Sequence, residues 1–214
     1  MTPALQLWSL SMAGRPPVRP LHSLTLNVYA GETLGLLGPA GSGKSTLLRL
    51  MAGEIRPDVG QVAAGGPPPV LLDEPLTDAD SPDGRRLRDR LRRWTRDEGR
   101  AVVLATPHAA VAHALCDRVA LLSEGCLLAE RPAADLAPLL AEERYRIRVR
   151  GRLDQHLSRW FDGFQLEQDA AHTALTGAVP DQSALRALLT RAFDLGLTVL
   201  EVTRLEPDLA PLCR

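Results

Sequence analysis

The segment that most constrains this chain is an apolar run followed by a glycine-rich loop and a helical stretch. Residues 33–37 are Thr-Leu-Gly-Leu-Leu, which predicts a strand buried on both faces of a sheet. Residues 38–45 read Gly-Pro-Ala-Gly-Ser-Gly-Lys-Ser, and residues 45–53 have helical spacing with a glycine stop. Glycines let successive backbone N–H groups face one anion, and the helix aims its positive end at the same point.

This strand–loop–helix unit predicts a site for the phosphate chain of a nucleotide. Lys44 supplies a charge for the β- and γ-phosphates, and Ser45 offers a hydroxyl to Mg²⁺. A chance match to the loop pattern is disfavoured because a buried strand precedes the loop and a helix follows it. The residues predicted to bind the nucleotide are Gly38, Pro39, Ala40, Gly41, Ser42, Gly43, Lys44, Ser45 and Thr46.

A second short apolar strand, residues 70–72, ends in Asp73 and Glu74. A carboxylate at such a strand end can hold Mg²⁺, so Ser45 and Asp73 are the predicted metal-binding residues. Glu74 is placed to orient or deprotonate an attacking water. The alternative, that these acidic residues only end a strand, loses weight because the phosphate loop occurs in the same chain.

The remaining pattern predicts an α/β fold with a mostly parallel sheet flanked by helices and preceded by antiparallel strands. Alternating residues 4–12 and 21–29 are the antiparallel strands, and residues 54–69, rich in Gly and Pro, are expected to form a loop. Further strands are expected at 101–105, 118–123 and 125–129, and helices at 82–97 and 109–116.

A second pattern begins after an expected linker helix at residues 132–143. Its order is strand, helix, strand, strand, helix, strand, which predicts a small ferredoxin-like α+β domain. We therefore expect two domains, 1–143 and 144–214. The expected strands of the second are 145–150, 164–168, 173–179 and 197–204, and its helices are 153–161 and 183–195.

Composition gives no sign of a nucleic-acid-binding protein, because the formal net charge is only −1. Arginines gather at residues 85–100 and 144–152, where we expect solvated surface. The three cysteines form no CxxC pair, which is typical of a reducing cytosol. No signal peptide and no membrane-spanning stretch are expected, so any membrane role needs a partner.

Several segments in one order resemble the ATPase subunit of ABC transporters over roughly residues 4–143. The resemblance implies that ATP and Mg²⁺ bind, that His108 in Thr-Pro-His is the switch histidine, and that His108 acts in catalysis with Glu74. The end of the chain resembles a small C-terminal domain found on some exporter-type ABC ATPases. The matching segments are 31–46, 56–62, 70–75, the D-loop-like 76–80, 106–108 and 115–125.

The chain departs from that family between its two nucleotide motifs. The family has a Q-loop, a helical subdomain that docks on the membrane partner, and an LSGGQ-type signature there. Here Val62 runs through Ala-Ala-Gly-Gly-Pro-Pro-Pro directly into Val70. The adenine-stacking aromatic is also absent near Met12, since Trp8 and Tyr29 lie elsewhere. ATP binding needs one chain only, whereas the signature acts on the partner's nucleotide.

We therefore expect the ATP-binding subunit of an ABC-type transporter, which hydrolyses ATP to drive a transmembrane permease. A homodimer is expected to hydrolyse slowly, whereas a heterodimer with an intact ABC ATPase completes one site. The expected location is the cytoplasm, at the inner face of the membrane where a partner holds the chain. The alternative is a regulatory or assembly module that binds ATP with little or no hydrolysis. A small nucleotide kinase is disfavoured by the motif order and the leading antiparallel strands.

Overall fold

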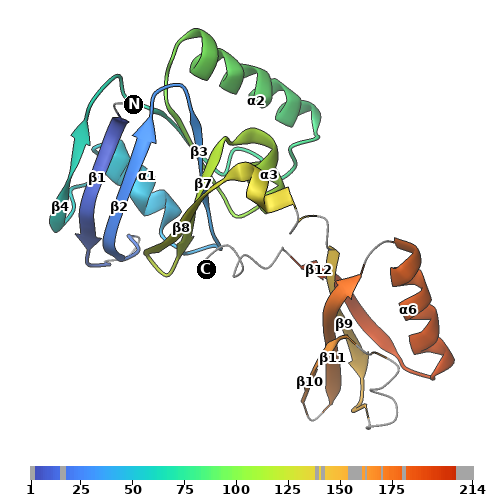
Figure 1. Ribbon diagram of the computed structural model, residues 1–214. Helices are drawn as coiled ribbons and strands as arrows, with labels where there is room; N and C mark the ends of the chain where they lie inside the picture. Colours follow the sequence, from blue (N-terminus) through green and yellow to red (C-terminus); the bar gives the residue numbers. More distant parts are fainter. Residues whose placement is uncertain are drawn as a thin grey trace. The chain divides into compact units, whose positions relative to one another are not determined.

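The computed structural model describes residues 3–14, 18–137, 140, 143–153, 161, 163–169, 171–179 and 182–205. The chain divides into two compact units, the first made of Met1–Ala137 and Leu209–Arg214 and the second of Pro138–Asp208 (Figure 1). Each unit has its own hydrophobic core. None of the helices in these ranges is long and apolar enough to span a bilayer.

The first unit is built on a five-stranded sheet in the order β5-β6-β3-β7-β8. The first four of these strands are parallel, and β8 is antiparallel to β7. Every residue of β3 and β6 is buried, which explains why both read as uninterrupted apolar runs. The strands are β3 Thr33–Leu37, β5 Val70–Asp73, β6 Val102–Thr106, β7 Arg118–Ser123 and β8 Cys126–Pro132.

The two faces of this sheet carry different cores. On one face Val103 and Ala105 of β6 pack with α1 (Lys44–Met51) and with the N-terminal strands. On the other face Val102 and Leu104 pack with α2 (Pro82–Arg92) and α3 (Ala109–Leu115). The predicted α/β fold, with helices flanking a mostly parallel sheet, is confirmed.

A separate three-stranded antiparallel sheet has the order β2-β1-β4, from β1 Pro3–Met12, β2 Leu21–Tyr29 and β4 Val59–Ala64. The first two strands confirm the alternation at 4–12 and 21–29. The expectation that residues 54–69 form only loop was wrong, because β4 pairs with β1 inside that range. Gly60 interrupts its pattern, and a Cβ there would lie 2.3 Å from the Trp8 carbonyl oxygen.

The expected helix over residues 82–97 begins and ends as its residues dictate. Ser81 caps α2 by accepting a hydrogen bond from the Gly84 N–H at 3.0 Å, and Pro82 occupies the first turn. The last turn, Arg93–Asp97, is π-helical. There the buried Thr95 hydroxyl donates to the Leu91 carbonyl at 2.9 Å, which competes with the regular backbone bond.

The expected linker helix at residues 132–143 was wrong at both ends. Strand β8 continues to Pro132, a 3₁₀ turn covers Ala133–Leu136, and β9 (Glu143–Arg150) has already begun at residue 143. The Ala133 N–H donates to the Asp117 carbonyl at 3.0 Å at the start of this turn, and residues 137 and 140 are helical, so the middle of the expected helix is confirmed.

The second unit is an antiparallel sheet in the order β10-β11-β9-β12. Strand β11 (His172–Val179) lies between β9 and β10 (Gln165–Gln168), which is the split arrangement that the predicted order requires. Helix α6 (Gln182–Asp194) covers one face, and β12 is Val199–Leu205. The helix expected at 153–161 falls largely outside the described residues.

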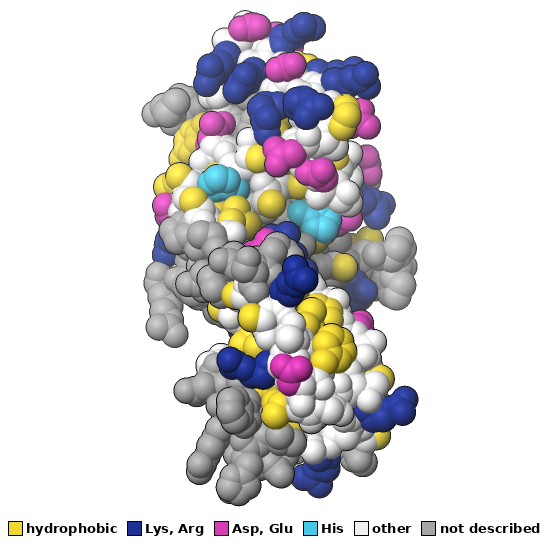
Figure 2. Space-filling model, turned by 90° about the vertical axis from the view of Figure 1, so that its right-hand side faces the viewer, with side chains coloured by type: hydrophobic (Ala, Val, Ile, Leu, Met, Phe, Trp, Pro, Cys, Tyr) yellow, Lys and Arg dark blue, Asp and Glu magenta, His cyan; other side chains and the backbone are white. Residues whose placement is uncertain are grey.

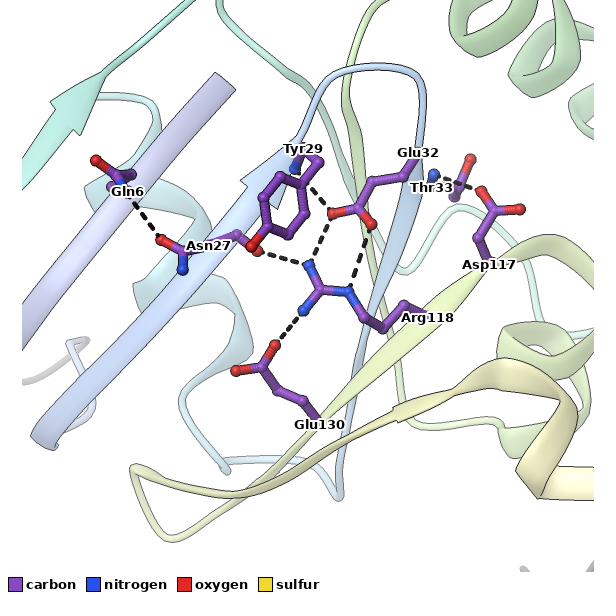
Figure 3. A network of polar contacts seen from close by, with 8 residues as sticks. All are labelled: Gln6, Asn27, Tyr29, Glu32, Thr33, Asp117, Arg118 and Glu130. Atoms are coloured by element: carbon purple, nitrogen blue, oxygen red, sulfur yellow. Dashed lines mark hydrogen bonds and ion pairs between the residues drawn. The ribbon is translucent and has the colours of Figure 1, made fainter. Parts of the chain in front are cut away.

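Arg118 connects four segments of the first unit (Figure 3). Its guanidinium pairs with Glu32 at 2.8 Å and with Glu130, and it donates to the Asn27 carbonyl at 2.6 Å. The guanidinium also lies 5.3 Å from the ring centroid of Tyr29. Burial by itself lowers the pKa of Arg118. The hydrogen bond and charge of Glu32, with the charge of Glu130, outweigh burial, so the net pKa is raised and the side chain stays charged.

Replacing Arg118 with Leu should lower the unfolding free energy of this unit by about 2–3 kcal/mol, because Glu32 and Glu130 lose their partner in a half-buried site. The measurement is urea unfolding. Arg49→Leu is the matched control, since its pair with Glu54 is exposed and is expected to matter by less than about 1 kcal/mol. Equal losses in the two variants would contradict this role for Arg118.

Candidate functional site

Three parallel strands bring the predicted site residues to one edge of the sheet. Leu37 at the end of β3 is in register with Thr106 at the end of β6, and Asp73 at the end of β5 is in register with Ala105. The phosphate loop, the acidic pair and the Thr106–His108 turn therefore all leave the sheet at its carboxyl edge. That edge is where ligands bind in open α/β sheets.

The phosphate loop has the curled backbone that its glycines predict. Gly41 and Gly43 have φ angles of 81° and 105°, which glycine adopts without strain. A Cβ on Gly38 would lie 2.1 Å from the Leu122 carbonyl oxygen, so only glycine fits there. Helix α1 begins at Lys44, directly after the loop. The first N–H groups of a helix lack partners within it and point out of its N-terminal end, here toward the phosphate loop.

Lys44 is buried under the loop that precedes it. Its ammonium donates to the carbonyl oxygens of Gly38 at 2.8 Å and Pro39 at 3.1 Å. The same ammonium lies 3.5 Å from the carboxylate of Glu74, whose side chain is about half exposed. The structure thus brings together a residue of the phosphate loop and one of the acidic pair that lie far apart in sequence.

Glu74 has a strained backbone at this edge. Its φ angle is 44°, in the left-handed region that a non-glycine residue seldom adopts. The Glu74 N–H donates to the Ala105 carbonyl at 2.9 Å, which holds the residue at the end of the sheet. Strain of this kind concentrates where function fixes a conformation.

Several oxygens near the loop suit a phosphate chain and Mg²⁺. Among the described side chains, Ser42 has a buried hydroxyl oxygen without a hydrogen-bond partner, and a phosphate oxygen would supply one. The side chains of Ser45 and Asp73 are exposed. No cluster of three or more His, Cys, Asp or Glu in the described ranges could hold a metal alone.

Thr46 and His108 are each positioned by backbone contacts. The Thr46 hydroxyl accepts a hydrogen bond from the Arg19 N–H at 3.1 Å. His108 stands at the start of α3, and its N–H donates to the buried Thr106 hydroxyl at 3.1 Å. The half-buried His108 follows the central strand of the three, β6.

Sequence reasoning missed Arg19. A Cβ on Gly41 would lie 3.6 Å from an Arg19 guanidinium nitrogen, so this cation sits beside the phosphate loop. The Arg19 N–H is tied to Thr46, which fixes the backbone of the residue against α1. Arg19 lies between β1 and β2, and the pairing of these strands brings it to the loop. No local sequence motif marks it.

Two family models match separate parts of the chain. The model of the family described as "ABC transporter" matches residues 21–95, which contain the phosphate loop and the acidic pair. The N-terminal unit is an ABC transporter ATP-binding domain. Residues 144–203 match a domain of unknown function, DUF8691.

Curated relatives of this ATP-binding domain are named as import proteins. The Phosphonates import ATP-binding protein of Anaeromyxobacter dehalogenans is 33% identical, over 96% of this chain and 42% of its own length. The Methionine import ATP-binding protein of Cereibacter sphaeroides is 28% identical, over 91% of this chain and 54% of its own. The chain thus spans about half the length of these relatives.

Solved structures agree on the fold. A dimeric bacterial ABC transporter cassette superposes with a TM-score of 0.54 at 16% identity, over 60% of this chain and 98% of the other. An ATP-binding subunit of an ABC transporter gives 0.53 at 17% identity, over 64% of this chain and 93% of the other.

Replacing Glu74 with Gly should leave the N-terminal unit about 1 kcal/mol more stable than replacing it with Ala, because glycine tolerates a positive φ. Thermal or urea unfolding measures the difference. The same pair of substitutions at Glu98, where φ is −99°, is the control and should not favour glycine. A glycine preference of the same size at both positions would show that Glu74 carries no backbone strain.

Proposed function

We propose that the chain is the ATP-binding subunit of an ABC-type transporter, which binds Mg-ATP and hydrolyses it to ADP and phosphate to drive a membrane partner. The observation that carries this proposal is the position of Lys44, buried in the phosphate loop and 3.5 Å from the Glu74 carboxylate. These two groups are the cation and the base that phosphoryl transfer to water requires.

Each predicted site residue has a role in this proposal. Residues 38–46 hold the phosphates through backbone N–H groups, with Lys44 as the charge. Ser45 and Asp73 hold Mg²⁺, which neutralises charge on the phosphates. Glu74 orients and deprotonates the attacking water, and His108 faces the γ-phosphate from the end of β6.

The import proteins among the relatives support a transmembrane permease as partner. The dimeric cassette among the solved structures supports pairing with a second copy or with an intact ABC ATPase. We place the chain in the cytoplasm, at the inner face of the membrane through that permease, and propose no nucleic-acid partner. The connection from Val62 to Val70 carries no signature motif, which supports slow hydrolysis by a homodimer.

The competing proposal is a regulatory or assembly module that binds ATP with little or no turnover. The same short connection supports it, because the groups that close a site over a partner's γ-phosphate are missing from this chain. The two proposals share the phosphate loop and differ only in whether Glu74 acts.

ATP binding and single-turnover hydrolysis separate the two. Lys44→Ala should weaken ATP binding by at least about tenfold, since it removes the charge at the β- and γ-phosphates. Glu74→Gln should keep the affinity and lower hydrolysis by about a hundredfold, since the base is lost. Calorimetry measures the first and phosphate release the second. ATP binding without hydrolysis, unchanged by Glu74→Gln, establishes the regulatory module, and no ATP binding contradicts both.

Arg19→Gln should weaken ATP binding by about threefold to tenfold, because the guanidinium beside Gly41 adds positive charge at the phosphate chain. The loss should shrink as salt is raised. Arg49→Gln, on the exposed side of α1, is the matched control. If both variants bind ATP like the unchanged protein, Arg19 has no part in the site.

A further inference from the structure

A concavity lies in the N-terminal unit, at the edge of the central sheet opposite the phosphate loop. It has a volume of about 190 Å³, and its lining includes Thr33, which begins β3, and Asp117, which directly precedes β7. The phosphate loop follows the other end of β3, and a strand of five residues spans about 16 Å. This cavity is therefore separate from the nucleotide site.

Three arginines line this cavity, and we call it the arginine pocket. Arg88, Arg92 and Arg96 follow one another at intervals of four residues along α2 and its π-helical turn, so they share one face. Figure 2 shows Lys and Arg side chains at the top of the view, with Asp and Glu side chains among them, at the height of α2 in Figure 1. Like charges at this spacing repel one another.

The three guanidiniums have little to neutralise them. None of the acidic side chains that the structure describes forms an ion pair with Arg88, Arg92 or Arg96. Asp117 is the acidic residue of the lining, and its carboxylate already accepts the Thr33 N–H at 2.8 Å. Burial, and then the Asp117 charge, raise the pKa of the Cys116 thiol in the same lining, so that group is neutral.

The second arginine cluster of the chain makes a useful contrast. On β9, Arg146 pairs with Glu167 at 2.5 Å and Arg148 lies 3.5 Å from Glu201, so neighbouring strands balance these charges. Both clusters were predicted to be solvated surface. Among the described residues, Arg88, Arg92 and Arg96 instead line a cavity in which Asp117 is the single acidic residue.

The backbone beneath the arginine pocket is held in an unusual form. The Glu98 N–H donates to the Arg93 carbonyl at 3.1 Å, five residues back, and the Thr95 hydroxyl bonds to Leu91. Single π-helical turns of this kind occur frequently at functional sites. The widened turn begins directly after Arg92 and contains Arg96, so it carries or adjoins two of the three lining cations.

We propose that the arginine pocket binds a phosphate group, carried either by a small phosphorylated molecule or by a lipid headgroup. Guanidiniums hold phosphate oxygens through paired, charge-assisted hydrogen bonds. The cavity is smaller than the 300–1,000 Å³ typical of sites for whole drug-sized ligands, so it accepts a single group and not a nucleotide. This inference does not depend on the function proposed for the nucleotide site.

The test uses the full chain carrying Lys44→Ala, which weakens phosphate binding at the phosphate loop. Inorganic phosphate is titrated by calorimetry, and binding to phosphatidylcholine vesicles with and without phosphatidic acid is measured by sedimentation. The double variant Arg88→Gln with Arg92→Gln should weaken phosphate binding, vesicle binding or both by at least about tenfold. Arg90→Gln with Arg93→Gln is the control, with the same charge change on α2 and its π-helical turn but outside the lining. Circular dichroism checks that each variant folds.

Binding of phosphate alone identifies a small phosphorylated ligand, and binding that needs phosphatidic acid identifies a headgroup. Either result supports the arginine pocket if the control pair keeps its affinity. Equal losses in the two pairs would show a diffuse basic surface and overturn the proposal. So would the absence of binding to both phosphate and vesicles.

Discussion

The parallel register of β5, β6 and β3 is the constraint on which the N-terminal unit depends. These strands are short, and β3 and β6 are buried on both faces, so they cannot slip along one another without exposing apolar side chains. Once the register is set, the loop after β3 and the acidic residues after β5 leave the sheet at the same edge. Lys44 and Glu74 are therefore brought together across β6. The local sequence around either residue does not determine this contact.

Arg118 secures the other edge of the same sheet. It joins the turn before β3 to β7 and β8, and reaches Asn27 on the antiparallel sheet (Figure 3). Burying polar groups is costly unless they are paired, so the network specifies how the two sheets meet. The hydrophobic core alone would tolerate several packings, whereas these directional bonds select one.

The sequence predicted what depends on local pattern and missed what depends on distant partners. Strands β3 and β6 are apolar runs, and β1 and β9 alternate. Burial determines the composition of these strands, so their sequences predict them. Strand β4 was missed, since Gly60 breaks its alternation and β1 supplies its hydrogen bonds. The helix expected from residue 132 starts later, because pairing with β7 keeps β8 extended to Pro132. At the site, the loop was found by motif, whereas Arg19 approaches it only through the fold.

The short connection at residues 65–69 joins two strands that are anchored independently. Strand β4 is held by β1 in one sheet, and β5 is held by β6 in another, so neither relies on the connection for its place. Loop-closure entropy grows only with the logarithm of loop length, by about 0.6 kcal/mol for each doubling. The connection is thus a position where a whole subdomain can be inserted or deleted at little cost in folding free energy. The strands that precede Lys44 and Glu74 stay folded in either case.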